Sequence, residues 1–452
     1  MPAVVWYILT MLVVICVWFI LLKRPVYEGV FISFIVLVAL TKTWNNVFGY
    51  FDSALSTSLL YSMMAFMAMS QILTKTKVID NCVTIILSIL GHIPGGAGYA
   101  SIVASSFMGA LSGSGPGNVM ATGVITIPAM KKSGFPPELA ANVESVGSGL
   151  GNMIPPSANI VAAIGAFIAV YPDSDMTMGR FWIVCWGISL WFILSRILQL
   201  FIFCKIYGIK KMPKEDIPNV KESLKKGWTG LLIPVIILAP YIFDSLFNAS
   251  FVTSRLGVTG AKYFSSSVLI FSAGVAAIFG IFLSKKRSEI TPRKVVEILG
   301  NGAKSLVPTV ATCIFGYMIG ALFMDINAET ELEGFLSGLN IGYVGLAILM
   351  PLMICFVSMV IPGSSIVVMF GPLIITLFAN VGADPLLVAA MLPCVCGVMC
   401  GITPPFALCM YAAMTIAESD FGKTVRNDLW WVAVQYLLEV VVLLGWLPIL
   451  GL

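Results

Sequence analysis

The chain has 452 residues, of which 59% are hydrophobic and only 11% are charged. A soluble domain carries about 25% charged residues, so this composition excludes a soluble protein and predicts an all-α polytopic membrane protein. Apolar segments are spaced along the whole chain, and they predict about 10–12 transmembrane helices. The formal net charge of +4 comes from basic loops and gives no reason to expect a nucleic acid as partner.

The first apolar segment predicts a spanning helix over Ala3–Leu22. It is not read as a cleaved signal peptide, because it is about 20 residues long and no basic region precedes it. Lys23 and Arg24 follow it, which places the N-terminus on the periplasmic side under the positive-inside rule. Two strongly basic loops, Lys205–Lys226 and Lys285–Lys294, flank a pair of predicted crossings, so both loops are expected in the cytoplasm.

The stretch around which the chain is organised is Gly109–Ser157, which contains a serine- and glycine-rich run over Ser112–Asn118. Glycines destabilise a helix interior and Pro116 removes a backbone donor, so this run predicts a break in the helix. A second break is predicted at Asn152–Ser157, which holds a Pro-Pro pair. Non-helical backbone at membrane depth is tolerated only where it is buried in protein or lines a wet cavity. The stretch is therefore interpreted as half of a transport site.

The two halves of the chain resemble each other when the second is placed on the first with a shift of 248 residues. The shift pairs Gly115 with Gly363, Gly123 with Gly371, Gly134 with Gly382 and Pro137 with Pro385. With one inserted residue it also pairs Pro155 and Pro156 with Pro404 and Pro405. We expect two inverted repeats, over residues 1–204 and 227–452, joined by a basic cytoplasmic linker over 205–226. Each repeat is expected to hold scaffold helices, a hairpin and a broken helix.

Glycines, prolines and small polar residues gather at the predicted breaks of both repeats. In the first repeat the candidate substrate- and ion-binding residues are Ser112, Gly113, Ser114, Gly115, Asn118, Asn152, Pro155, Pro156 and Ser157. In the second repeat they are Gly363, Ser364, Ser365, Gly401, Thr403, Pro404 and Pro405.

Freed backbone carbonyls, with hydroxyl and amide oxygens, form a hard oxygen shell that suits Na⁺. The Na⁺ candidates are Ser114, Asn118, Ser157, Ser364 and Thr403. Free N–H groups at the N-termini of half-helices suit a carboxylate. The alternative is that the glycines and serines only let helices pack closely and the prolines only kink them.

Few acidic residues lie inside or beside apolar segments, and Glu144 and Glu439 each have more than one interpretation. Glu144 is a functional candidate because an acid at membrane depth is costly, or else it lies at the water interface beside the 135–137 turn. Asp384 precedes Pro385 and is expected to cap a helix. Glu439 either binds a neighbouring subunit or extends to the membrane surface.

No constellation of catalytic residues is present in the sequence, and the chain is not expected to be an enzyme. It lacks the Gly-x-x-x-x-Gly-Lys-Ser/Thr run that binds ATP phosphates. The only cysteine cluster, Cys394, Cys396 and Cys400, is expected to consist of small buried apolar side chains. His92, the single histidine, lies in a loop-like segment and is a candidate for a proton relay only if a partner lies nearby. No cofactor is expected.

Several segments in combination resemble the large membrane subunit of tripartite ATP-independent periplasmic (TRAP) transporters. In the first half these are Gly113–Asn118, Ile127–Pro137 and Ile154–Ser157. In the second half Gly401–Pro405 and Tyr411–Ala413 are similar to the corresponding part of that subunit. The resemblance covers nearly the whole chain.

The resemblance implies an elevator-type secondary transporter of the ion-transporter superfamily, with two re-entrant helical hairpins, in the bacterial inner membrane. It implies import of a small organic anion, such as a dicarboxylate, sialic acid or keto acid, driven by Na⁺ or H⁺. The implied partners are a soluble periplasmic substrate-binding protein, a small four-helix membrane subunit and the lipid bilayer. A stand-alone dicarboxylate or Na⁺/H⁺ carrier of the same superfamily is the alternative. A membrane-embedded enzyme or an assembly scaffold is a third hypothesis.

Overall fold

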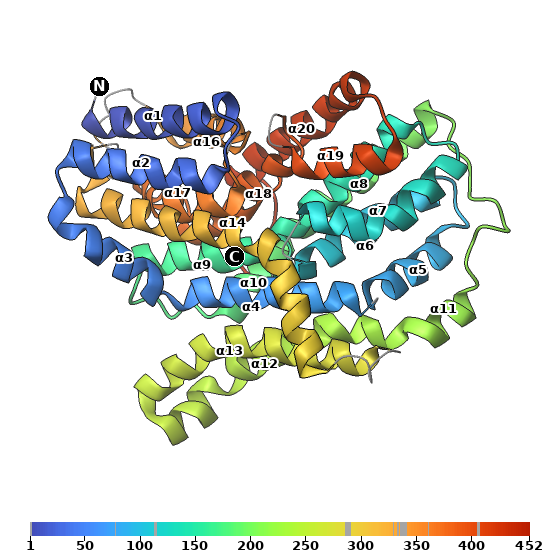
Figure 1. Ribbon diagram of the computed structural model, residues 1–452, viewed down its shortest axis with the longest axis horizontal. Helices are drawn as coiled ribbons and strands as arrows, with labels where there is room; N and C mark the ends of the chain where they lie inside the picture. The colour runs from blue at the N-terminus through green and yellow to red at the C-terminus, as the bar shows by residue number, and fades with distance from the viewer. Residues whose placement is uncertain are drawn as a thin grey trace.

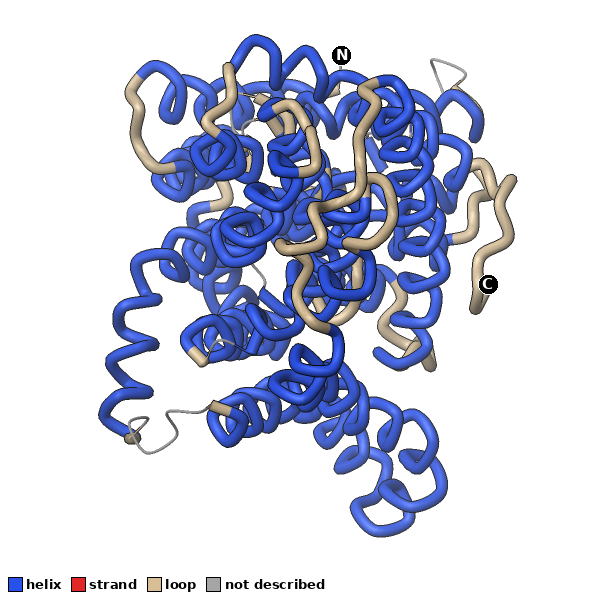
Figure 2. Tube along the Cα trace, turned by 90° about the vertical axis from the view of Figure 1, so that its right-hand side faces the viewer, coloured by secondary structure: helices blue, strands red, loops and turns tan. Residues whose placement is uncertain are grey.

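The computed structural model describes residues 2–76, 78–112, 115–284, 291–328, 330–331, 334, 341–359, 361–404 and 407–452. Three predicted site residues, Gly113, Ser114 and Pro405, lie outside these ranges, and for Ser112 only the backbone is described. In the described ranges the regular structure is helical, joined by loops and without strands, as Figure 2 shows. The all-α class expected from the sequence is therefore confirmed.

The first half of the chain forms one series of helices. These are α1 (Ala3–Cys16), η1 (Val17–Leu21), α2 (Val26–Thr41), η2 (Trp44–Asn46), α3 (Val47–Ser56), α4 (Ser58–Lys75), α5 (Val78–Leu90), α6 (Gly96–Ser112), α7 (Gly115–Lys132), α8 (Pro137–Leu150), η3 (Gly151–Met153), α9 (Ala158–Val170) and α10 (Met178–Ile206).

The second half begins with a short helix after a loop and ends with a long one. Its elements are α11 (Val220–Gly227), η4 (Trp228–Leu232), α12 (Ile233–Phe247), η5 (Asn248–Val252), α13 (Thr253–Leu283), α14 (Pro292–Asp325), α16 (Tyr343–Ser358), α17 (Gly363–Asn380), α18 (Pro385–Gly397), η7 (Met399–Gly401), α19 (Leu408–Ala417) and α20 (Phe421–Leu443).

Seven helical stretches in the described part of the chain are long and apolar enough to cross a membrane. They are Ala3–Leu21, Pro137–Val170, Met178–Ile206, Val220–Asp244, Tyr263–Leu283, Val307–Asp325 and Gly363–Asn380. Further apolar helices, such as α2 and α16, are shorter. The chain is thus a multi-pass membrane protein, and the larger number of crossings stays a prediction.

The elements around the predicted site recur at one offset along the chain. Helices α7 and α17 begin at Gly115 and Gly363, 248 residues apart, and α8 and α18 begin at Pro137 and Pro385 with the same spacing. The turns after α7 and α17 contain Gly134 at φ 93° and Gly382 at φ 86°. Only glycine adopts this left-handed conformation without strain, which explains why the sequence match includes these two positions.

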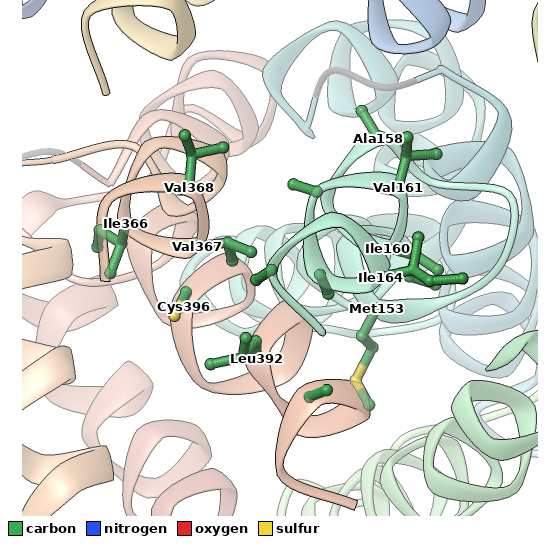
Figure 3. Packing of buried hydrophobic residues seen from close by; sticks show 14 of the residues in the cluster. Met153, Ala158, Ile160, Val161, Ile164, Ile366, Val367, Val368, Leu392 and Cys396 are labelled. Atoms are coloured by element: carbon green, nitrogen blue, oxygen red, sulfur yellow. The ribbon is translucent and has the colours of Figure 1, made fainter. Parts of the chain in front are cut away.

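The first broken helix, formed by α8 and α9, links the first hairpin, α6 and α7, to the second hairpin, α16 and α17. Helix α8 packs against α6, α7 and α19, whereas α9 packs against α17 and α18. In Figure 1, α7, α8 and α19 therefore lie in one half of the molecule, and α9 and α17 in the other. Where α9 packs against α17 and α18, the buried apolar side chains include Ile160, Val367 and Leu392 (Figure 3). The break between α8 and α9 falls where the two groups meet.

The first predicted break is shorter than the sequence suggested. Helix α6 ends at Ser112 and α7 begins at Gly115, so Pro116 and Asn118 are helical rather than part of a break over Ser112–Asn118. A proline in the first turn costs little, because its missing N–H has no partner within the helix there. The same holds in the second half, where Ser364 and Ser365 belong to the first turn of α17 and Pro362 precedes it.

The basic linker expected over 205–226 is partly helical. Helix α10 continues to Ile206 and α11 begins at Val220. Between them the Lys210 N–H donates to the Ser133 carbonyl at 3.1 Å, and Lys132 pairs with Asp216. The linker is thereby attached to the end of the first hairpin.

Candidate functional site

The first break is a buried turn closed by its own polar groups. After η3 the chain turns through Pro155 and Pro156, and Ser157 is the N-cap of α9. The Ser157 hydroxyl donates to the Asn152 carbonyl at 2.5 Å and accepts from the Ile160 N–H at 3.4 Å. Its cap satisfies one of the free N–H groups that begin a helix.

The second break has a similar construction after η7. The Thr403 hydroxyl donates to the Met399 carbonyl at 2.7 Å, and the Thr403 side chain is buried. Pro404 follows, and α19 begins at Leu408. Both breaks therefore place a buried hydroxyl beside backbone that has left the helix.

The structure brings the tip of the first hairpin and the second break together at one side chain. A Cβ built on Gly115 would lie 2.5 Å from Cys409 Sγ, and one built on Gly401 would lie 2.9 Å from the same sulfur. Both distances are shorter than any ordinary carbon–sulfur contact, so the backbone at both glycines lies directly against Cys409 in α19. Predicted residues almost 300 positions apart are thus neighbours.

The tip of the second hairpin lies against the end of α18, and the first break is bonded to the same end. A Cβ on Gly363 would lie 2.4 Å from the Cys396 carbonyl oxygen and 2.5 Å from the Gly397 Cα. The Asn152 amide donates to the Gly397 carbonyl at 2.8 Å. The ends of α8 and α18, which lead into the two breaks, also approach each other, since a Cβ on Gly149 would lie 3.4 Å from the Val398 carbonyl oxygen and 3.9 Å from Ile402 Cγ2. The four predicted breaks thus form one continuous region.

Buried oxygens without ordinary partners lie on both hairpins. Asn118 donates from Nδ2 to the Ser105 carbonyl at 2.8 Å and to Ser148 Oγ at 2.7 Å, which leaves its Oδ1 without a partner in the described structure. Ser365 Oγ is also buried without a hydrogen bond of ordinary geometry. The Cys313 thiol, a weak partner, lies beside Ser364 and Ser365. Free buried oxygens cost stability unless something binds them, and a cation binds oxygen.

Glu144 is fully buried and accepts four hydrogen bonds from hydroxyls. Its Oε1 accepts from Ser105 at 2.7 Å and from Thr122, and its Oε2 accepts from Ser101 at 2.6 Å and Thr126 at 2.5 Å. The donors lie on α6 and α7, so the carboxylate joins both helices of the first hairpin to α8. The alternative that Glu144 lies at the water interface is wrong, since its exposed fraction is 0%.

The sequence analysis did not predict a second buried polar network, which is centred on Arg196. Arg196 of α10, 1% exposed, donates to the Trp431 carbonyl at 2.9 Å and to Gln435 Oε1 at 2.7 Å. Gln435 in turn donates to Glu439 Oε1 at 2.8 Å, and Asp428 is buried nearby on α20. The signal was present, because an arginine inside an apolar helix is rare unless it has partners.

Both interpretations of Glu439 are corrected by this network. Glu439 is fully buried within the chain, so it neither extends to the membrane surface nor faces a neighbouring subunit. Its Oε1 also lies 3.6 Å from Cys394 Sγ.

Asp384 caps α18, as expected, because its carboxylate accepts from the Leu386 N–H at 2.8 Å. His92, the candidate for a proton relay, is exposed in the turn after α5.

The cysteine cluster is buried, as expected for small apolar side chains. Cys394, Cys396 and Cys400 are all free thiols with little or no exposed surface. Within the described ranges no group of three or more His, Cys, Asp or Glu side chains is placed to hold a metal ion.

Two solved transporters share the fold of this chain. One is the YdaH transporter of Alcanivorax borkumensis, with a TM-score of 0.59, 17% identity and coverage of 91% of this chain and 90% of that chain. The other is MtrF of Neisseria gonorrhoeae, described as illuminating a class of antimetabolite efflux pumps, with a TM-score of 0.65, 15% identity and coverage of 91% and 86%. By fold the chain is therefore a helical multi-pass membrane protein with the architecture of these two proteins.

The sequence comparisons identify the family. The DctM component of the tripartite ATP-independent periplasmic transporters matches residues 4–450. A C4-dicarboxylate TRAP transporter large permease protein of Vibrio cholerae is 27% identical over 413 residues, which cover 86% of each chain. A 2,3-diketo-L-gulonate TRAP transporter large permease protein of Escherichia coli is 23% identical over 393 residues, 84% of each chain. A sialic acid TRAP transporter large permease protein of Vibrio cholerae is 23% identical over 349 residues, 76% of this chain and 74% of that one.

The chain belongs to the TRAP transporter large permease family. It is a multi-pass protein of the bacterial inner membrane, and its relatives are transport permeases rather than enzymes. The family predicted from the resemblance is thereby confirmed.

Proposed function

We propose that this chain is the large membrane subunit of a secondary active symporter that imports a small organic acid. One observation supports this most: four chain breaks from two halves of a TRAP permease meet in one buried region that retains free oxygens. Such breaks provide what a transporter needs at mid-membrane, namely oxygens for a cation and N–H groups for an anion. The substrates named for the relatives, which include C4-dicarboxylates, sialic acid and 2,3-diketo-L-gulonate, are acids.

The proposed coupling ion is Na⁺. Asn118 Oδ1 and Ser365 Oγ are buried oxygens without ordinary partners, and Ser157, Ser364 and Thr403 supply further hydroxyl oxygens near the breaks. A shell of neutral oxygens suits a hard monovalent cation. The carboxylate of the substrate would be bound by backbone N–H groups in the first turns of α7 and α17, which begin at Gly115 and Gly363.

The proposed mechanism follows from the packing. The two hairpins and the two broken helices form one mutually packed group, in which Glu144 joins α6, α7 and α8. Such a group can move as a unit against the remaining helices, which is the elevator mechanism. We propose that residues 1–204 and 227–452 are inverted repeats, with the linker 205–226 in the cytoplasm and the N-terminus in the periplasm.

TRAP large permeases work with a soluble periplasmic binding protein and a small membrane subunit, and we propose the same two partners here. The test is uptake of labelled C4-dicarboxylate, sialic acid and 2,3-diketo-L-gulonate into proteoliposomes. Inward Na⁺ and H⁺ gradients are varied independently, and the binding protein and the small subunit are each included or left out. We expect uptake that needs the Na⁺ gradient, the small subunit and the binding protein. Full uptake without the binding protein would instead show a stand-alone carrier.

A further inference from the structure

A cavity of about 740 Å³ lies between α10 and the hairpin helices, away from the four breaks. The residues that line it include Leu90 at the end of α5, Tyr99 and Val103 of α6, and Ile197, Phe201 and Lys205 of α10. Its volume is in the range of a site for an organic ligand. Its walls are almost wholly apolar, and no acidic residue is among those that line it.

The cavity lies beside an exposed apolar surface of α10. Helix α10 is one of the membrane-crossing helices, and Leu194, Leu198 and Ile202 on it are about half exposed or more. Phe201, which lines the cavity, is itself 46% exposed. An apolar cavity that reaches such a surface is in contact with hydrocarbon, so its occupant is expected to be an acyl chain.

Among the described residues that line the cavity, Lys205 alone is charged. Lys205, in the last turn of α10, is exposed, and its Nζ lies 4.5 Å from the centre of the Phe201 ring. Its apolar stem can follow the cavity wall while the ammonium group reaches the membrane surface. Lys210 and Lys211 of the linker that follows are also exposed, but neither lines the cavity.

We propose that this cavity is a binding site for an anionic phospholipid of the cytoplasmic leaflet. One acyl chain occupies the apolar cavity between α6 and α10, and the negatively charged headgroup pairs with Lys205. Basic groups at the cytoplasmic end of a transmembrane helix attract anionic lipids with about 1 kcal/mol for each lysine. The bound lipid contacts both α6 of the first hairpin and α10. The proposed lipid site does not depend on which substrate or ion the protein transports.

The test is native mass spectrometry of the full chain with phosphatidylglycerol or phosphatidylcholine added in equal amounts. We expect the protein to retain phosphatidylglycerol in preference to phosphatidylcholine. Lys205→Gln should weaken this retention about fivefold, the equivalent of one lysine. Its control is Lys211→Gln, an exposed lysine of the same linker that does not line the cavity, which should retain the lipid as the unaltered protein does.

A second pair of variants tests the acyl-chain part of the site. Ile197→Trp places an indole in the cavity and should abolish retention, whereas Leu198→Trp, on the exposed face of the same helix, should not. Equal retention of the two lipids by the unaltered protein would overturn the proposal. So would equal losses in Lys205→Gln and Lys211→Gln, or in Ile197→Trp and Leu198→Trp. Lys205→Gln changes only an exposed side chain, so the proposal remains testable if Ile197→Trp fails to fold.

Discussion

The side chain of Asn152 donates a hydrogen bond of 2.8 Å to the carbonyl of Gly397. This contact joins the first break to the last residue of α18, across 245 positions of sequence. Because α18 belongs to the second half of the chain, the bond holds the two broken helices in one arrangement.

Asn152→Ala should therefore reduce transport by loosening the two breaks relative to each other. We expect a loss of about 1 kcal/mol of stability, the usual net value of one hydrogen bond, and a much larger loss of uptake. Thermal unfolding in detergent and proteoliposome uptake measure the two effects. Asn219→Ala is the matched control, because Asn219 caps α11 by accepting from the Glu222 N–H, far from the breaks. Equal effects of both variants on uptake would contradict the role of Asn152.

Gly115→Ala should reduce uptake, and removing the Cys409 sulfur should restore it. The added Cβ would lie 2.5 Å from Cys409 Sγ, a clash that costs about 1–3 kcal/mol in a packed core. In the double variant Gly115→Ala/Cys409→Ala the sulfur is absent, so a double-mutant cycle should show coupling of comparable size. Uptake and thermal stability of the four proteins give the cycle.

Gly363→Ala provides the contrast for this cycle. Its added Cβ would meet backbone, the Cys396 carbonyl oxygen at 2.4 Å, which no side-chain change removes. Cys409→Ala should therefore not rescue Gly363→Ala. Additive effects of Gly115→Ala and Cys409→Ala would mean that the first hairpin tip does not lie against α19.

These contacts also show how far the sequence could predict the site. The repeated glycines and prolines predicted the breaks, because each acts locally: Gly134 and Gly382 are required by their own φ angles. The pairing of Gly115 with Cys409, or Asn152 with Gly397, depends on how α7, α8, α18 and α19 pack, and no local pattern encodes this. Pro116 was misleading because a proline occurs both in helix breaks and in the first turn of a helix, and the sequence alone does not distinguish the two. Arg196 was overlooked because its partners lie over 230 positions away.

Arg196→Met should destabilise the protein severely. It removes the cation from a buried site that also holds Asp428 and Glu439, and breaking such a buried arrangement costs about 3–5 kcal/mol. We expect a large fall in thermal stability and in the yield of folded protein. Arg180→Met, at the exposed start of the same helix, should leave both unchanged. A melting temperature of Arg196→Met within 1–2 °C of the unaltered protein would show that the network contributes little.

Glu144→Gln should lower stability without changing the ion that drives uptake. Both carboxylate oxygens accept from two hydroxyls each, and an amide nitrogen in place of one oxygen cannot accept. We expect a loss of about 1–3 kcal/mol, measured by thermal unfolding, and uptake reduced in proportion to the folded fraction. Glu418→Gln, whose side chain is 85% exposed, is the control. If Glu144→Gln folds as well as the unaltered protein but loses its Na⁺ dependence, Glu144 acts in coupling rather than in holding the hairpin.

Ser365→Ala should weaken Na⁺ binding while leaving stability unchanged or slightly higher. Ser365 Oγ is buried without an ordinary hydrogen bond, so its removal leaves no other group unpaired. If it contributes an oxygen to Na⁺, the Na⁺ concentration for half-maximal uptake should rise about tenfold, since 1.4 kcal/mol corresponds to a factor of ten. Ser358→Ala is the matched control, because Ser358 is equally buried but donates to the Cys355 carbonyl at 2.8 Å. That variant should change stability slightly and leave the Na⁺ dependence alone. An unchanged Na⁺ dependence in Ser365→Ala would remove this hydroxyl from the ion site and leave Asn118 as the better candidate.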